Sequence, residues 1–162
     1  MGEPEIKKTS AIKMVGIKVA TSLAADKTSL LWQRFMKLRG GIKNASSKDL
    51  YSVQVYGKNF MTGDFDTDSI FEKWAGMSVT DHDTSYKILE NLVIPQGLYA
   101  VFTHHGTAKK FADTSKYIFE NWLPASEYRL ANRPHFEVLG STYKGPENPD
   151  SEEHIWIPIE EK

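Results

Sequence analysis

The chain has no cysteine, and no hydrophobic run approaches the length of a membrane span. The lack of cysteine excludes disulfide bonds and thiolate metal ligands, and it suits a reducing cytoplasm. A spanning helix needs about 20 apolar residues in succession, so we expect no membrane segment. The first residues, Met-Gly-Glu-Pro, also lack the apolar core of a signal peptide. We therefore expect a cytoplasmic protein.

An excess of charge of either sign is missing as well. The 20 lysine and arginine residues nearly balance 21 aspartate and glutamate residues, which gives a formal net charge of −1. Nucleic-acid binding surfaces need clustered positive charge, so we expect no direct nucleic-acid binding and no contact with an anionic membrane. A hydrophobic content of 40% in 162 residues is enough for one packed domain over residues 1–162.

Motifs for metals and cofactors are also lacking. His104 and His105 are adjacent, which puts their imidazoles on opposite faces of a strand. Residues 64–68 are similar to a calcium loop, but Ser69 stands where that loop needs glycine and Ala75 where it needs glutamate. The sequence contains no glycine-rich phosphate loop and no Gly-x-Ser-x-Gly elbow. We expect neither a metal nor a cofactor.

What the sequence does contain is an internal repeat. Val-Gln-Val-Tyr-Gly at residues 53–57 returns 83 residues later as Phe-Glu-Val-Leu-Gly at residues 136–140 (136 against 53). An offset near half the chain length predicts two copies of one strand–helix–strand–strand unit. The copies cover about residues 11–80 and about residues 95–160.

Hydrophobic periodicity within each copy predicts the elements. Thr28 or Ser29 can cap a helix whose apolar residues recur at i, i+4 and i+7. Thr107 can cap a second helix, which stops at Pro124. Residues 1–10 are polar and predict a frayed terminus. The fold class is α+β, with tandem pseudo-symmetric repeats, an antiparallel sheet packed on two main helices and a ligand cleft between the repeats. Alternation predicts strands over residues 11–22, 51–56, 70–79, 98–104, 136–142 and 155–159.

The two copies differ at one informative position, where Gln54 of the first matches Glu137 of the second. Glu137 shares a strand face with His135 and Leu139. Burying an unpaired carboxylate costs several kcal/mol or forces its protonation. One interpretation is a negative charge at the bottom of an aromatic cleft, which suits a flat organic cation. The other is a Glu137 that is exposed or bonded to a nearby basic residue such as Arg133.

Aromatic residues supply candidate walls for such a cleft. Each ring could add about 0.5–2 kcal/mol through cation–π contact, and hydroxyl or indole groups could orient a ligand. Each also has a structural interpretation, because Trp122 on a helix face fits the core. Trp74 and Trp156 stand at equivalent positions and fit a role in packing the sheet. The candidates are Tyr56, Trp74, Trp122, Tyr128 and Trp156.

Four segments together resemble the GyrI-like small-molecule-binding family: residues 99–106, 122–126, 133–138 and 155–159. That family is the effector-binding domain of many AraC-type and MerR-type transcription regulators, and it also occurs alone. The resemblance covers nearly the whole chain and implies the tandem-repeat fold. It also implies that Glu137 faces a ligand. Because the two copies use up the length, the chain looks like a stand-alone member.

The resemblance leaves three functions open. The first is a small-molecule-binding protein that captures or senses hydrophobic, aromatic or cationic compounds, as in multidrug binding. The second is a hydrolase of strained cyclopropane-containing natural products, in which Glu137 acts as base and Tyr56 or Tyr128 as acid. The third is a protein-interaction modulator, such as an inhibitor of DNA gyrase.

Overall fold

The computed structural model describes residues 2–82 and 86–162. Within them, the strands form one sheet in the order β1-β6-β9-β8-β3-β4-β2-β5, and β7 pairs with β9. All of the pairings are antiparallel. The strands are β1 (Glu5–Thr9), β2 (Ile12–Thr21), β3 (Leu50–Val55), β4 (Phe71–Ser78), β5 (Glu90–Ile94), β6 (Gly97–His105), β7 (Tyr128–Leu130), β8 (His135–Leu139) and β9 (Glu152–Glu161).

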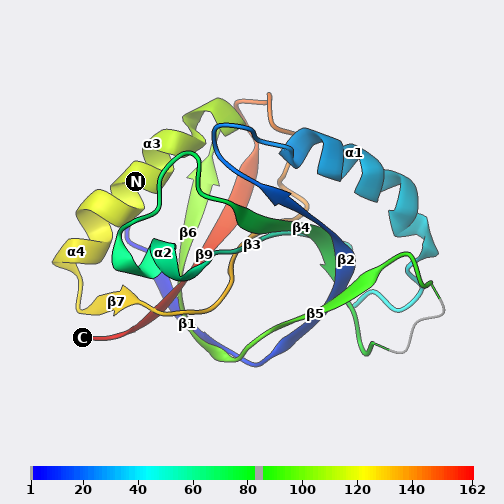
Figure 1. Ribbon diagram of the computed structural model, residues 1–162, viewed down its shortest axis with the longest axis horizontal. Coiled ribbons are helices and arrows are strands. Elements are labelled where there is room, and N and C mark those ends of the chain that lie inside the picture. Colours follow the sequence, from blue (N-terminus) through cyan, green and yellow to red (C-terminus); the bar gives the residue numbers. More distant parts are fainter. Residues whose placement is uncertain (1, 83–85) are drawn as a thin grey trace.

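Two helical regions cover one face of this sheet, α1 over one end and the α3–α4 run over the other (Figure 1). Apolar side chains at i and i+4 place Leu31 and Phe35 of α1 in the core. Ile118 and Trp122 have the same spacing in the second region. The helices are α1 (Thr28–Leu38), η1 (Arg39–Gly41), α2 (Lys58–Thr62), η2 (Ala108–Lys110), α3 (Phe111–Lys116), the π-helical η3 (Tyr117–Trp122) and α4 (Leu123–Ala125).

The same order of elements occurs in both halves of the chain. Strand β2, helix α1 and strands β3 and β4 match β6, the α3–α4 run, β8 and β9. The two halves meet in the middle of the sheet, where Val53 of β3 is the partner of Phe136 in β8. These residues are also the ones that the 83-residue offset makes equivalent. The α+β class with an antiparallel sheet on a few helices is confirmed.

Side-chain alternation gives the sheet two different faces. On the helix-covered face, Ala75 belongs to the cluster under α1 and Ile155 to the cluster under η3. The opposite face carries no helix in the described part of the chain. Here Val53, Trp74 and Phe136 belong to a third buried cluster.

The sheet is curled toward its helix-free face, because the chain crosses between its two edges twice. Edge strand β1 is joined to β2, near the opposite edge, by Ser10 and Ala11 alone. Edge strand β5 is joined to β6 in the same way by Pro95 and Gln96. Links of two residues span only about 11 Å, so the edges must approach one another at this end (Figure 1). The helix-free face is therefore concave.

The structure corrects several expectations at the level of elements. Residues 1–10 are not frayed, because Glu5–Thr9 pairs along β6 and its backbone groups gain partners that the polar sequence does not reveal. Strands β5 and β7 and helix α2 were not predicted. Thr107 does not cap the second helix with its side chain, and the helical run begins as a 3-10 turn at Ala108.

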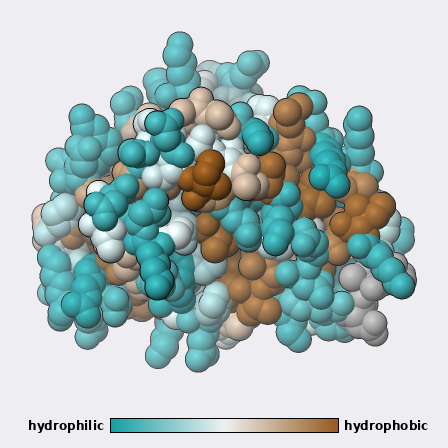
Figure 2. Space-filling model, in the orientation of Figure 1, coloured by the Kyte–Doolittle hydropathy of each residue, from teal (hydrophilic) through white to brown (hydrophobic). Residues whose placement is uncertain are grey.

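The surface is mainly hydrophilic on the face drawn in Figure 2, with hydrophobic side chains gathered near the centre and toward one side. Several large hydrophobic side chains are more than half exposed, among them Leu30 and Ile70. Of the helices in the described residues, none is both long and apolar enough to cross a membrane.

Candidate functional site

Glu137 lies on the helix-covered face, at the centre of the sheet. Its neighbours across the sheet are Ser52 of β3 and Ile155 of β9. Only 8% of Glu137 is exposed. The alternative of a surface-exposed Glu137 is therefore wrong, and burial makes its partners decisive.

Two buried side chains from the first half of the chain contact this carboxylate. Gln54 Nε2 donates a hydrogen bond to Glu137 Oε1 over 3.1 Å, and Lys73 Nζ lies 4.0 Å from the same oxygen. Gln54 and Glu137 are thus bonded to each other at equivalent positions of the repeat. The basic neighbour that the second interpretation expected is therefore Lys73. The example given for it, Arg133, donates to the Leu98 carbonyl and lies over a tyrosine ring.

Burial and the two polar partners act on the Glu137 carboxyl group in opposite directions. Burial raises the pKa of this carboxyl group, and the Lys73 ammonium and the Gln54 amide lower it by a smaller amount. A carboxyl group with a raised pKa can hold a proton, accept one or balance an incoming positive charge. Such groups cluster at functional sites.

A second carboxyl group belongs to this site, and sequence analysis missed it. Burial raises the pKa of Glu153 to about 7, with a further increase from Glu137 and a decrease from Lys73. Glu153 stands two residues before Ile155 in β9, so both point to the helix-covered face. Glu153 has the i, i+2 spacing of the apolar residues Ile155 and Ile157, so it shares their strand face. This spacing is the sequence signal that could have revealed Glu153 as a site residue.

A cluster of aromatic side chains lies next to these polar groups and reaches Glu137 through Tyr56. Tyr56 stacks on Phe60 with ring centroids 4.0 Å apart, and both rings contact the imidazole of His135. Burial, followed by the charge of Glu137, raises the pKa of Tyr56. Phe60 is carried by α2, which sequence analysis did not predict. We call this set the aromatic cover: Tyr56, Phe60, Phe65, Phe71 and Phe119.

His135 is buried beneath this cover, and burial lowers its pKa to about 3. The folded protein therefore binds fewer protons than the unfolded chain between pH 6.5 and pH 3, and stability falls as pH falls through this window. Relative to His135→Phe, the wild type should lose about 1.4 kcal/mol of unfolding free energy per pH unit. Urea unfolding of both proteins from pH 7 to 4.5 measures this difference. A difference that stays constant with pH would contradict a buried neutral imidazole.

The structure brings only one of the five predicted aromatic walls to Glu137, namely Tyr56. Trp74 and Trp156 face the opposite side of the sheet, where they pack with the third cluster. Trp122 packs on Phe102 and stacks on Tyr128, with its indole donating to a glutamate near the N-terminus. Trp156 also lines a cavity on that side of the sheet, and Trp122 and Tyr128 line a second cavity.

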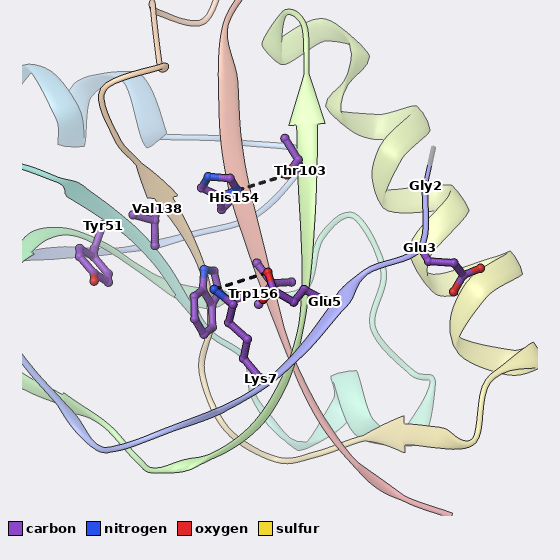
Figure 3. A pocket seen from close by; sticks show the side chains of 10 residues that line it. Gly2, Glu3, Glu5, Lys7, Tyr51, Thr103, Val138, His154 and Trp156 are labelled. Atoms are coloured by element: carbon purple, nitrogen blue, oxygen red, sulfur yellow. Dashed lines mark hydrogen bonds and ion pairs between the residues drawn. The ribbon is translucent and has the colours of Figure 1, made fainter.

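A separate cavity of about 440 Å³ lies on the concave helix-free face, away from Glu137. Figure 3 shows Tyr51 and Trp156 on its walls, with Lys7 and Glu5 of β1 at its rim. The Lys7 ammonium pairs with Glu5 and lies 5.6 Å from the Trp156 ring centre. Since the chain's own cation already occupies this ring, the cavity is a weaker candidate than the buried carboxylates.

The helix-covered site thus has a defined chemical capacity. It offers two carboxyl groups, one ammonium group, an amide and a tyrosine hydroxyl beside a cluster of aromatic rings. Access to Glu137 requires part of the aromatic cover to move, because the carboxylate is buried.

Known sequences that are similar to this chain match it over nearly its whole length. The profile of the GyrI-like small molecule binding domain matches residues 2–160. The transcriptional regulator BrlR of Pseudomonas aeruginosa is 27% identical over 150 residues, which is 92% of this chain and 52% of the regulator. The chain therefore spans about half the length of this relative.

Solved structures with the same fold include proteins of different activities. SAV2435 bound to tetraphenylphosphonium has a TM-score of 0.73 at 12% identity, over 98% of this chain and 94% of that one. The EcmrR C-terminal domain has a TM-score of 0.74 at 11% identity, over 99% and 98%. A hydrolase from Listeria innocua has a TM-score of 0.59 at 10% identity, over 98% and 92%. At these identities the likeness concerns the fold.

Proposed function

We propose a function for this chain, which belongs to the GyrI-like family of small-molecule-binding domains. The protein captures or senses hydrophobic aromatic compounds, cationic ones among them, at the site of Glu137. The ligand's rings displace or intercalate into the aromatic cover, and its positive charge is balanced by the buried carboxylate. The observation that carries this proposal is the buried Glu137 carboxyl group, whose pKa is raised by burial and which interacts with Tyr56 of the aromatic cover.

Physical arguments support a cation at this position. A buried carboxylate has lost its hydration and gains from any charge partner that enters with it. Aromatic faces attract cations, and large organic cations with spread charge are easy to desolvate. Tetraphenylphosphonium, which SAV2435 binds, is therefore a suitable probe for this chain.

Equilibrium dialysis with tetraphenylphosphonium, read by ligand mass, tests the proposal. We expect saturable binding with one ligand per chain and an unchanged ligand mass. Because binding must disturb the aromatic cover, the near-ultraviolet circular dichroism of its rings should change as ligand is added. The dissociation constant from this change should equal the one from dialysis. No saturable binding of this probe or of other aromatic cations would contradict the proposal and direct attention to a protein partner.

Hydrolysis is the second candidate, and the proximity of Tyr56 to Glu137 favours it. Glu137 would take a proton from water as the oxygen attacks a strained cyclopropane carbon. The broken ring bond would pass its electrons to a conjugated oxygen, which Tyr56 would protonate. The raised pKa of Tyr56 keeps its hydroxyl protonated for this step.

Tyr56→Phe separates the two candidates. If the protein is a hydrolase, this variant should bind a cyclopropane-containing electrophile normally but form the water adduct about 100-fold more slowly. If the protein only captures ligands, neither wild type nor variant should form an adduct. Product mass against time measures both. Equal adduct formation by the two proteins would exclude Tyr56 as the acid.

A further inference from the structure

The site contains three charged groups from three strands. Lys73 of β4 lies 4.0 Å from Glu137 of β8, and Glu153 of β9 is close enough to interact electrostatically with both. Lys73 and Glu137 are both buried. Charges held this far from water interact strongly and must be nearly balanced. The count of charges at this site therefore limits what can bind there.

Strand register places Glu153 beside the buried pair. Ile155 is the partner of Glu137 across β8 and β9, and Glu153 is two residues from Ile155 on the same face. Diagonal neighbours of this kind lie about 7–8 Å apart. With both carboxyl groups ionised, the three groups carry a net charge of −1, because Lys73 balances one of the two carboxylates.

We propose that Lys73 and Glu153 set this site to accept a single positive charge, supplied either by a proton or by an aromatic monocation. This inference rests on the proposed function, namely that the ligand binds at Glu137. The preferred ligand class is an aromatic compound with one quaternary or delocalised positive charge. An aromatic dication would leave one positive charge unbalanced beside Lys73 in a buried environment, and so would bind more weakly.

The other groups around Glu153 do not change this count. His104 is its partner on β6, but the two ring nitrogens of His104 lie within hydrogen-bond distance of the Thr114 hydroxyl and the Thr107 carbonyl. Tyr143 stays neutral because burial and Glu153 raise its pKa. His135 and Tyr56 are also neutral near pH 7. The charged side chains of α3 and η3 are exposed: Asp113, Lys116 and Glu120.

The inference links ligand binding to proton release. The pKa of Glu153 lies at about 7, so its carboxyl group holds a proton at pH 6 that a monocation must displace. The affinity for a quaternary monocation should rise about tenfold between pH 6 and pH 8, because the ionised fraction rises by that factor. Glu153→Gln should abolish this rise, since the site then holds one carboxylate that Lys73 already balances.

A matched pair of probes tests the charge count. The monocation 1-methyl-4-(4-pyridyl)pyridinium and the dication 1,1′-dimethyl-4,4′-bipyridinium differ by one methyl group and one charge. We expect the wild type to prefer the monocation at pH 8. Lys73→Met, with Lys73→Gln as a second variant, should bind the dication at least tenfold more tightly than the wild type does. The control is Lys18→Met, which removes an exposed lysine that pairs with Glu72 and Glu90.

The outcomes separate this inference from the function on which it rests. If the wild type binds aromatic cations but Lys73→Met and Lys73→Gln leave the ratio of monocation to dication affinity unchanged, the inference is wrong and the proposed function stands. A similar change in Lys18→Met would also overturn it. A pH dependence of affinity that persists in Glu153→Gln would overturn it as well, because the titrating group would then lie elsewhere. If no protein of the set binds any aromatic cation, both proposals fail.

Discussion

Replacing Glu137 by glutamine should weaken the binding of tetraphenylphosphonium about 30- to 150-fold. Glutamine keeps the shape of the side chain and removes its charge, so the loss corresponds to about 2–3 kcal/mol for a buried charge-assisted contact. The amide oxygen of the new glutamine can still accept the hydrogen bond that Gln54 donates to Glu137, which helps the variant to keep the local fold. Calorimetric titration at pH 8 measures the affinity.

Glu90→Gln is the matched control for this variant. Glu90 is exposed on edge strand β5 and pairs with Lys18, far in the sheet order from β8. The Glu90→Gln variant changes the net charge by the same amount without altering the site. Its affinity for tetraphenylphosphonium should therefore stay within twofold of the wild-type value. Equal affinities of Glu137→Gln and Glu90→Gln would show that the charge of Glu137 plays no part in binding.

Gly16→Ala should destabilise the fold by about 3 kcal/mol, since overpacking against fixed backbone leaves no low-energy adjustment. Gly16 is the partner of Gly76 across β2 and β4. A Cβ at Gly16 would lie within 3 Å of the Ala75 carbonyl oxygen and the Gly76 Cα. The strands would have to separate, and β4 carries Lys73. Urea unfolding at pH 7 measures the loss.

Gly40→Ala provides the comparison for Gly16→Ala. A Cβ at Gly40 meets nothing within 4 Å, so this change should alter the unfolding free energy by less than about 0.5 kcal/mol. If Gly16→Ala were equally tolerated, the close approach of β2 and β4 would be wrong. The register that brings Lys73 toward the centre of the sheet would then also be in doubt.

Much of the architecture could be predicted because each repeat carries its own periodic signal. Alternation in residues 53–57 and 136–140 placed Gln54, Tyr56 and Glu137 on corresponding faces, and the structure has them there. Strand β1 could not be predicted in this way. Its Glu-Ile-Lys-Lys-Thr sequence has no apolar face, and it is held by backbone pairing to β6.

The composition of the site depended on register, which sequence alone does not fix. Trp74 and Lys73 are adjacent and therefore face opposite sides of β4, but only pairing with β3 decides which of them shares a face with Glu137. The pairing selects Lys73. For the same reason Glu153, rather than Trp156, joins Glu137 across β8 and β9.

A crystal structure of the protein with tetraphenylphosphonium would show on which face of the sheet the cation binds. We expect the phosphonium on the helix-covered face, with its phenyl rings among displaced side chains of the aromatic cover and its charge facing Glu137. Phe60 should have left its stacked position on Tyr56. A ligand bound instead in the concave cavity against Tyr51 and Trp156 (Figure 3), with Glu137 still buried, would show that Glu137 is not the cation site.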